Sequence, residues 1–383
     1  MTTLPSLHLA PSISTIGQKA WDACAGGDDP FTSYAFLSAL EDSGCACAQT
    51  GWQPAHLHLR QDNAVLGLVP AYLKSHSYGE YVFDHSWADA FERAGGRYYP
   101  KLQASVPFSP INGPRLLAAT PAHRTLLAQG LAAACGQSGA SSAHLTFHSA
   151  QEVDDMTQAG FLVRRGLQFH FENQGYRDFA EFLAALNARK RKNIRKERAA
   201  AQNSGLKIRT LSGADLQTQH FDAFFAFYQD TSERKWGQAY LNRSFFDLLH
   251  QRLADQIVLF MAFDGKQPVA GALNLKSTTT LFGRNWGCLQ DHKFLHFELC
   301  YYQAIDYALA QGLQRVEAGA QGGHKISRGY APVLTYSSHY IAHPQFRHAV
   351  AGFLEEERRQ MQGEAAYIQA QMSPFRKPSS ADS

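Results

Sequence analysis

The sequence predicts a mixed α/β fold in which one unit of helices and partly antiparallel sheet occurs twice. Two pairs of predicted strands are joined by the tight turns Asp62-Asn63 and Asp264-Gly265, which is typical of antiparallel hairpins. After each hairpin come a further strand, a helix that ends in glycine and a last strand, so the order of elements repeats. In the second copy, residues 281–330 run strand, helix and strand, which favours parallel pairing with ligand at the strand ends.

In the first half of the chain, apolar spacing and β-branched runs predict the individual elements. Helices are predicted over 31–39, 87–94 and 122–136, and strands over 55–60, 64–73, 78–83, 143–147 and 161–171. Residues 97–110 contain three prolines, which exclude a helix and predict an ordered loop rich in aromatic residues.

The second half begins with the most helical segment of the chain, 179–203. Further helices are predicted over 215–231, 245–253, 294–310 and 349–371, and strands over 206–211, 257–263, 269–275, 278–286, 315–318 and 333–341. We therefore expect three parts. They are an N-terminal domain over 1–175, a C-terminal domain with the basic helix 179–203 over 176–345, and a helical tail over 346–383 whose end is disordered.

The composition is that of a globular protein, with 45% hydrophobic and 18% charged residues among 383. A formal net charge of +3 excludes a bulk nucleic-acid binder. No apolar run approaches the ~20 residues of a membrane span, and the N-terminus lacks the basic start and long apolar core of a signal peptide. We expect a cytoplasmic protein, and peripheral association with the inner face of the membrane stays an open alternative.

The six cysteines are scattered, and Cys45 and Cys47 are too close together for a zinc knuckle. No second pair follows them, so the sequence predicts reduced thiols and no metal site. No residue shows the paired nucleophile and base of covalent catalysis, which favours direct attack in any transfer reaction.

Most polar residues without an evident structural role fall within 281–330. Transfer of an acyl group to an amine needs a base for the amine proton and donors for the oxyanion. Glu317 and Glu298 are candidate bases, and His296 is a candidate proton carrier. A carboxylate within a short apolar strand is costly unless it is partnered, which favours a functional Glu317. Glu298 has the alternative of a residue near a helix start, where the helix dipole favours it.

The same stretch carries cations on a strand and on the glycine-broken loop that follows 315–318. The loop cations resemble a clamp for a carboxylate or a phosphate, and a solvated basic loop is the alternative. Arg284 and Trp286 lie two residues apart on the predicted strand and so share one face, which predicts either a cleft wall or an ordinary cross-strand pair. The substrate-binding candidates here are Arg284, Trp286, Gln321, His324, Lys325 and Arg328.

Seven of the ten residues in 189–198 are cationic. A solvated helix face is one interpretation, and contact with tRNA phosphates or with an anionic membrane surface are the others. The candidates for binding phosphate or another anion are Arg189, Lys190, Arg191, Lys192 and Lys293.

The aromatic loop 97–115 is predicted either to cap the acceptor site or to pack between the domains. Its candidate substrate-binding residues are Tyr98, Tyr99, Lys101 and Phe108.

Several motifs occur together along the chain. They are Tyr98-Tyr99-Pro100-Lys101-Leu102-Gln103, Pro107-Phe108-Ser109-Pro110, the basic run 189–198, Phe282-Gly283-Arg284-Asn285-Trp286-Gly287, His296-Phe297-Glu298, residues 317–322, His324-Lys325 and Arg328-Gly329-Tyr330. This combination resembles the bacterial FemAB-like predicted N-acyltransferases of peptidoglycan biosynthesis and recognition, in the GCN5-related N-acetyltransferase (GNAT) superfamily. The resemblance covers about residues 30–370 and implies two tandem GNAT-like domains, with the active cleft mainly in the second.

The resemblance implies an N-acyltransferase that moves an acyl or aminoacyl group to a primary amine, in cell-envelope metabolism. The glycine-rich phosphate loop of acyl-CoA-using relatives is missing between Trp286 and Phe294, so acyl-CoA and aminoacyl-tRNA both stay open as co-substrates, and no tightly bound cofactor is expected. The acceptor is expected to be a small-molecule or lipid-linked amine, a long-chain amine included. A non-catalytic recognition protein that binds a cell-wall precursor or lipid headgroup is the rival hypothesis, and the chain is expected to be a monomer or a homodimer.

Overall fold

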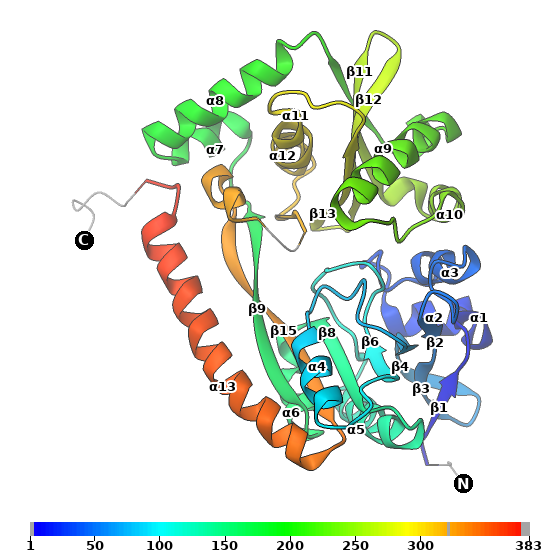
Figure 1. Ribbon diagram of the computed structural model, residues 1–383. Coiled ribbons are helices and arrows are strands. Elements are labelled where there is room, and N and C mark those ends of the chain that lie inside the picture. Colours follow the sequence, from blue (N-terminus) through cyan, green and yellow to red (C-terminus); the bar gives the residue numbers. More distant parts are fainter. Residues whose placement is uncertain (1–3, 320–321, 377–383) are drawn as a thin grey trace. The chain divides into compact units, whose positions relative to one another are not determined.

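The computed structural model describes residues 4–319 and 322–376, and the chain divides into two units (Figure 1). Unit 1 comprises Met1–Gly166 and Leu334–Gly363, and unit 2 comprises Leu167–Val333 and Glu364–Ser383. Residues 334–363 therefore belong with the N-terminal part of the chain. In the described residues, no helix combines the length and the apolar character that crossing a membrane requires.

Unit 1 contains a small antiparallel sheet in the order β1-β3-β4-β7 and five strands of a larger sheet in the order β15-β8-β6-β5-β2. Its elements are β1 (Ser6–Ala10), α1 (Ile13–Ile16), α2 (Gln18–Ala25), α3 (Tyr34–Asp42), β2 (Trp52–Pro54), β3 (His56–Gln61), β4 (Ala64–Val69), β5 (Ala71–Lys74), α4 (His85–Arg93), β6 (Lys101–Ala104), β7 (Leu117–Ala118), α5 (Pro121–Gln137), β8 (Ser142–His148), α6 (Val153–Gln158), most of α13 (Pro344–Tyr367) and parts of β9 (Leu162–Glu172) and β15 (Ala331–Ile341). The apolar face of β6 and β8 packs with helix α5 to form the core.

Three predictions for unit 1 were wrong in local detail. The strand expected over 64–73 is two strands, because Pro70 lacks the N–H that a continuous ladder needs and β4 and β5 lie in different sheets. No strand forms over 78–83, which runs as turns and bends. The loop expected over 97–110 contains strand β6, since its prolines flank residues 101–104 rather than interrupt them.

Unit 2 is built on the strand order β10-β11-β12-β13-β14-β9. Its elements are α7 (Phe179–Ala185), α8 (Ala188–Gln202), β10 (Lys207–Leu211), α9 (Thr218–Trp236), α10 (Arg243–Leu253), β11 (Ile257–Asp264), β12 (Gln267–Lys276), β13 (Thr280–Cys288), α11 (Leu295–Phe297), α12 (Gln303–Ala310) and β14 (Arg315–Glu317). The helix expected over 179–203 is two helices, because Asn187 adopts an extended conformation and caps α8 through its side chain.

Strand β11 shows why the centre of unit 2 is covered on both faces. Its run Ile257–Phe263 is buried throughout, as expected for a strand between two helical layers. Val258 and Phe260 pack in the cluster that contains α12, and Figure 1 shows α9 and α10 on the other side of the strands. The predicted hairpin at Asp264-Gly265 is confirmed, and so is the parallel pairing of β13 with β14.

Candidate functional site

Strands β13 and β14 stay paired over three residues only, ending at Phe282 and Glu317. Strand β13 continues to Cys288 with β12 as its partner, and among the described residues no strand pairs with its other edge beyond Phe282; this unpaired edge is called the opening below. A β-bulge places Arg284 between the pairs Asn274–Gly283 and Leu273–Asn285. Bulges often re-aim side chains next to active sites, and this one lies where the two parallel strands separate.

The helix that follows β13 is irregular where it carries candidate residues. Phe294 has a φ of 63° just before α11, and residues Glu298–Tyr302 form a π-helical turn between α11 and α12. Short π-helical turns are rare in proteins overall, but those that occur often lie at functional sites. The turn lies directly after His296 in the chain, and it contains Glu298.

Trp286, His296 and His324, named from sequence as separate candidates, come together in one group of rings. The ring centroids of His296 and Trp286 are 5.2 Å apart, and those of His296 and His324 are 6.3 Å apart. Tyr301 completes the group, since its hydroxyl lies 2.8 Å from Nε2 of His324 and its ring centroid lies 5.5 Å from that of His296. The group brings together residues of β13, of the following helix and of the loop after β14.

His296 is a neutral base at physiological pH. Burial above all, and then the nearby charges of Lys235, His324, Arg328 and Lys325 in that order, together lower the pKa of its imidazole to about 4. Within residues 4–319 and 322–376, neither ring nitrogen of His296 takes part in a hydrogen bond. A neutral, half-buried imidazole with a free nitrogen can accept a proton from a substrate.

Lys325 is a buried lysine with a weak set of partners. Its side chain is almost fully buried, the residue being 1% exposed, and its Nζ donates to the carbonyl of Gly319 at 2.8 Å. Burial lowers the pKa of Lys325 to about 8. No carboxylate in the described part of the chain pairs with it, so the ammonium is available for an anion or a developing oxyanion.

Arg328 connects the loop after β14 to helix α8. Its Nη2 donates to Oε2 and Oε1 of Glu197 at 2.9 and 3.1 Å, and its Nη1 donates to the carbonyl of His324 at 2.8 Å. The guanidinium also lies over the ring of Phe297, 3.5 Å from its centroid. These contacts hold Arg328 beside His324, and the carboxylate of Glu197 compensates part of the positive charge of Arg328.

The two candidate carboxylates differ in their surroundings. Glu298 is fully buried, and both its oxygens accept hydrogen bonds from Arg198, at 3.2 and 3.3 Å, while Oε1 also accepts one from Gln303 at 2.8 Å. Glu317 lies at the end of β14, where its Oε1 is 3.8 Å from Nδ1 of His170 and 3.9 Å from Nη1 of Arg315. Glu298 is therefore engaged in a structural ion pair, whereas Glu317 sits at the strand end that borders the opening.

The remaining candidates of unit 2 lie outside the ring group. Arg284 is half-buried on the bulge, Lys293 is exposed beside Phe294, and Gln321 lies outside the described residues. On helix α8, Arg189 and Lys192 are exposed and Lys190 and Arg191 are half-buried. No ion pair involves these four cations in the part of the chain that the structure describes.

The candidates of the aromatic loop lie in unit 1 and are buried, apart from the half-buried Tyr99. The Nζ of Lys101 donates to Asp84 at 2.5 Å and to Glu80 at 2.7 Å, and the hydroxyl of Tyr98 donates to Asp84 at 2.7 Å. Phe108 has a φ of 57°, and its buried ring packs against Trp52. Tyr98 and Lys101 thus belong to a buried polar cluster rather than to an exposed wall.

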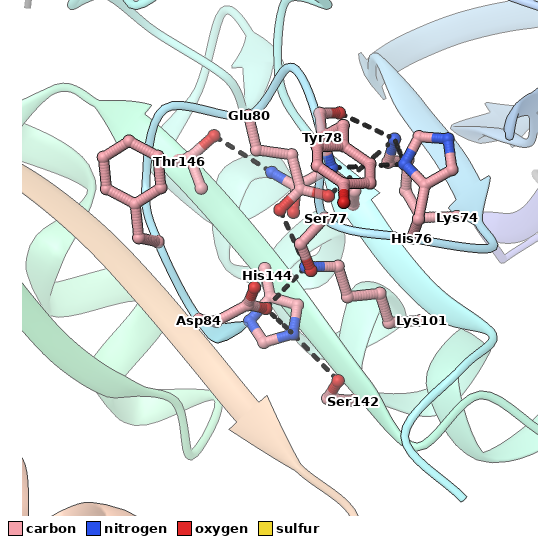
Figure 2. Close-up of polar contacts among 12 residues, drawn as sticks. Lys74, His76, Ser77, Tyr78, Glu80, Asp84, Lys101, Ser142, His144 and Thr146 are labelled. Carbon is pink, nitrogen blue, oxygen red and sulfur yellow. Dashed lines mark hydrogen bonds and ion pairs between the residues drawn. The ribbon is translucent and has the colours of Figure 1, made fainter. Parts of the chain in front are cut away.

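That cluster contains residues that sequence reasoning missed, and Figure 2 shows Lys74, Glu80, Asp84 and His144 around Lys101. Burial lowers the pKa of Lys74 to about 7 and raises that of Glu80 to about 7. Burial also lowers the pKa of His144 to about 3, so its imidazole is neutral. The available signal was a lysine at the end of an otherwise apolar strand, Ala71–Lys74.

Comparison with known proteins gives a family and a fold. A model of the FemAB-like family, described as peptidoglycan biosynthesis/recognition, matches residues 12–377. The crystal structure of FemX has a TM-score of 0.55 and 10% identity, covering 91% of this chain and 100% of that chain. The structure of L-PGS from Bacillus licheniformis has a TM-score of 0.51 and 10% identity, covering 85% and 97%.

A protein of unknown function from Bacteroides thetaiotaomicron has a TM-score of 0.52 and 9% identity, covering 88% of this chain and 100% of that chain. No curated protein matches the sequence. At these identities the likenesses establish the fold alone. The predicted mixed α/β fold with tandem GNAT-like units is confirmed.

Proposed function

The chain belongs to the FemAB-like peptidoglycan biosynthesis/recognition family, and on that premise we propose that it is an N-acyltransferase. The nitrogen of a primary amine attacks the acyl carbon of an activated donor and forms a tetrahedral intermediate. The bond from the acyl carbon to the carrier then breaks, an amide remains, and the carrier leaves as a thiol or a hydroxyl. The proton lost by the amine passes to a base of the protein and from that base to the departing carrier.

The single observation that carries this proposal is the ring group in which His296 lies beside Trp286 and His324, with neither of its ring nitrogens hydrogen-bonded to the residues that the structure describes. The lone pair of its unprotonated imidazole can accept the amine proton when the bond to the acyl carbon forms. Glu317 is the second candidate base, because it lies at the end of β14 beside the opening. Glu298 is assigned to structure, since both its oxygens accept hydrogen bonds from Arg198.

Lys325, which pairs with no carboxylate among the described residues, supports an anionic donor. Lys325 would stabilise the oxyanion or a phosphate of the carrier, and Arg284 and Arg328 would add charge at the same opening. Both acyl-CoA and aminoacyl-tRNA carry phosphates, so either fits this charge. The cations at 189–192 on α8 would bind further phosphates of such a donor, and an anionic membrane surface is the alternative partner for them.

The proposal is tested by product formation. The purified protein is incubated with acyl-CoA or with aminoacyl-tRNA, together with small-molecule and long-chain amines, and the products are identified by mass spectrometry. His296→Gln is expected to reduce turnover by about 10²-fold, since it removes a general base. His348→Gln is the matched control, because His348 is an exposed histidine on α13.

Two results would count against the proposal. Equal rates for His296→Gln and the wild type would exclude the imidazole as the base. Absence of any amide product with both donors, together with binding of a cell-wall precursor or lipid headgroup, would favour the non-catalytic recognition protein instead.

A further inference from the structure

One face of the sheet in unit 1 is polar and buried. On the antiparallel strands β5 and β6, Lys74 lies opposite Lys101, and Tyr72 lies opposite Gln103. Gln103 in turn lies beside His144 of the parallel strand β8. Because side chains alternate along a strand, these five residues share one face, whereas the opposite face of the same strands belongs to the apolar core.

Two lysines directly opposite each other on a sheet repel, so this pair needs an explanation. Both are completely buried, and both face carboxylates of the segment 75–84, which covers the polar face. Figure 2 shows Glu80 and Asp84 of this segment with Lys101. Lys101 is fully compensated by the two carboxylates, while Lys74 lies 3.9 Å from Oε1 of Glu80 and donates to the carbonyl of Tyr78 at 3.2 Å.

In the described part of the chain, three carboxylate and amide oxygens of this cluster have no hydrogen bond, and neither has the hydroxyl of Tyr72 on the same face. Glu80 and Asp84 each use one oxygen for Lys101, and their second oxygens, Oε1 and Oδ1, have no hydrogen-bond partner. Oε1 of Gln103 has none either, although its Nε2 donates to Thr146 at 3.0 Å. Buried acceptors without donors are unfavourable, and their presence together indicates a missing hydrogen-bond donor.

We propose that the polar face of unit 1 binds a primary ammonium group at Glu80, Asp84 and Gln103. An ammonium carries three donors and no acceptor, which matches three free acceptor oxygens, two of them on carboxylates. A neutral hydroxyl brings only one donor and would leave two of these oxygens without a hydrogen bond. The choice of an amine as the ligand rests on the proposed function, because a primary amine is the acceptor of that reaction. The inference adds which residues recognise the ammonium group of that amine.

The segment 75–84 is suited to admit such a ligand. It contains no helix or strand, and Tyr81 within it has a φ of 60°, a conformation that non-glycine residues rarely adopt. The backbone N–H of Phe108 donates to the carbonyl of Gly79 at 3.1 Å, and two side chains add contacts, since Lys74 binds the carbonyl of Tyr78 and Arg164 binds the carbonyl of Phe83 at 2.7 Å. The segment belongs to no strand ladder, so no strand pairing of the sheet depends on its conformation.

The test measures amine binding to the full chain without any acyl donor. Saturation-transfer NMR is recorded with ethanolamine as the probe, with ethylene glycol as a neutral probe of similar size and with phosphate as an anion. Ethanolamine is expected to bind the wild type, and Glu80→Gln and Gln103→Met are expected to weaken that binding about tenfold. Glu92→Gln, which changes an exposed carboxylate on α4, is expected to leave it unchanged.

Several results would overturn the inference. These are no binding of ethanolamine by the wild type, equal binding of ethylene glycol, binding of phosphate in its place, or unchanged binding in both Glu80→Gln and Gln103→Met. Melting curves show whether the variants fold. If Gln103→Met does not fold, the binding measured for Glu80→Gln decides the test, because the glutamine keeps an oxygen for Lys101. Because the binding assay contains no acyl donor, an absence of ethanolamine binding would overturn this inference but not the proposed transfer reaction. An absence of acyl transfer together with ethanolamine binding would overturn the proposed function but not this inference.

Discussion

Replacing Lys325 by methionine tests the electrostatics of the opening in unit 2. Burial holds the pKa of Lys325 at about 8, below its ordinary value of 10.5. The folded protein therefore disfavours the protonated form, and this cost is complete below pH 8 and disappears as the pH rises to 10.5. The difference between the two pKa values corresponds to roughly 3 kcal/mol of the free energy of unfolding.

Methionine removes that cost but also the hydrogen bond from Nζ to the carbonyl of Gly319, which contributes about 1 kcal/mol. Lys325→Met is therefore expected to be more stable than the wild type by about 2 kcal/mol at pH 7 and less stable by about 1 kcal/mol at pH 10.5. The same variant is expected to lose acyl transfer, since the ammonium would no longer stabilise the oxyanion.

Urea unfolding followed by far-UV circular dichroism, repeated from pH 7 to pH 10.5, measures the difference between variant and wild type. Lys192→Met, which removes an exposed lysine on α8, is the control and is expected to show no such pH dependence. A difference that stays constant over this pH range, or a less stable variant at pH 7, would refute the assignment of Lys325 as a buried, uncompensated ammonium.

Two further predictions concern the packing around the opening. Glu298→Gln leaves Arg198 with Asp306, 2.6 Å away, as its carboxylate partner, and it is expected to lower the free energy of unfolding by about 1–3 kcal/mol in chemical denaturation; no measurable loss would contradict a structural ion pair. Gly287→Ala is expected to destabilise by about 1–3 kcal/mol, because its Cβ would lie 2.3 Å from the backbone of Phe227. Gly352→Ala on α13 has open space and is expected to stabilise by about 0.5–1 kcal/mol, and equal melting temperatures of the two variants would contradict the steric argument.

Periodicity in the chain was sufficient to find most elements, since local apolar spacing reflects which face of a helix or strand is buried. Helix α5, strand β8 and both hairpins lie close to their predicted residues. The errors occur where neighbouring residues compete with periodicity, as at Pro70, which ends β4, and at Asn187, which starts a second helix.

For the candidate site, motif positions indicated the stretch 281–330 but not the role of each group. Glu298 looked equivalent to Glu317 in the sequence, and only folding brought Arg198, a hundred residues away, onto both of its oxygens. His296 could not be told from the other histidines in the sequence, and only folding placed its ring beside Trp286 and His324 and near several cations.

The amino-acid order alone therefore determined the fold class, the family resemblance and the segment in which the candidate residues gather, because these depend on local pattern. Tertiary structure decided which charged groups are compensated, because that depends on strand register and on contacts between distant residues. Lys74 and Lys101 lie opposite each other because of the register between β5 and β6, and Glu80 contacts both. No local pattern in the sequence shows this arrangement.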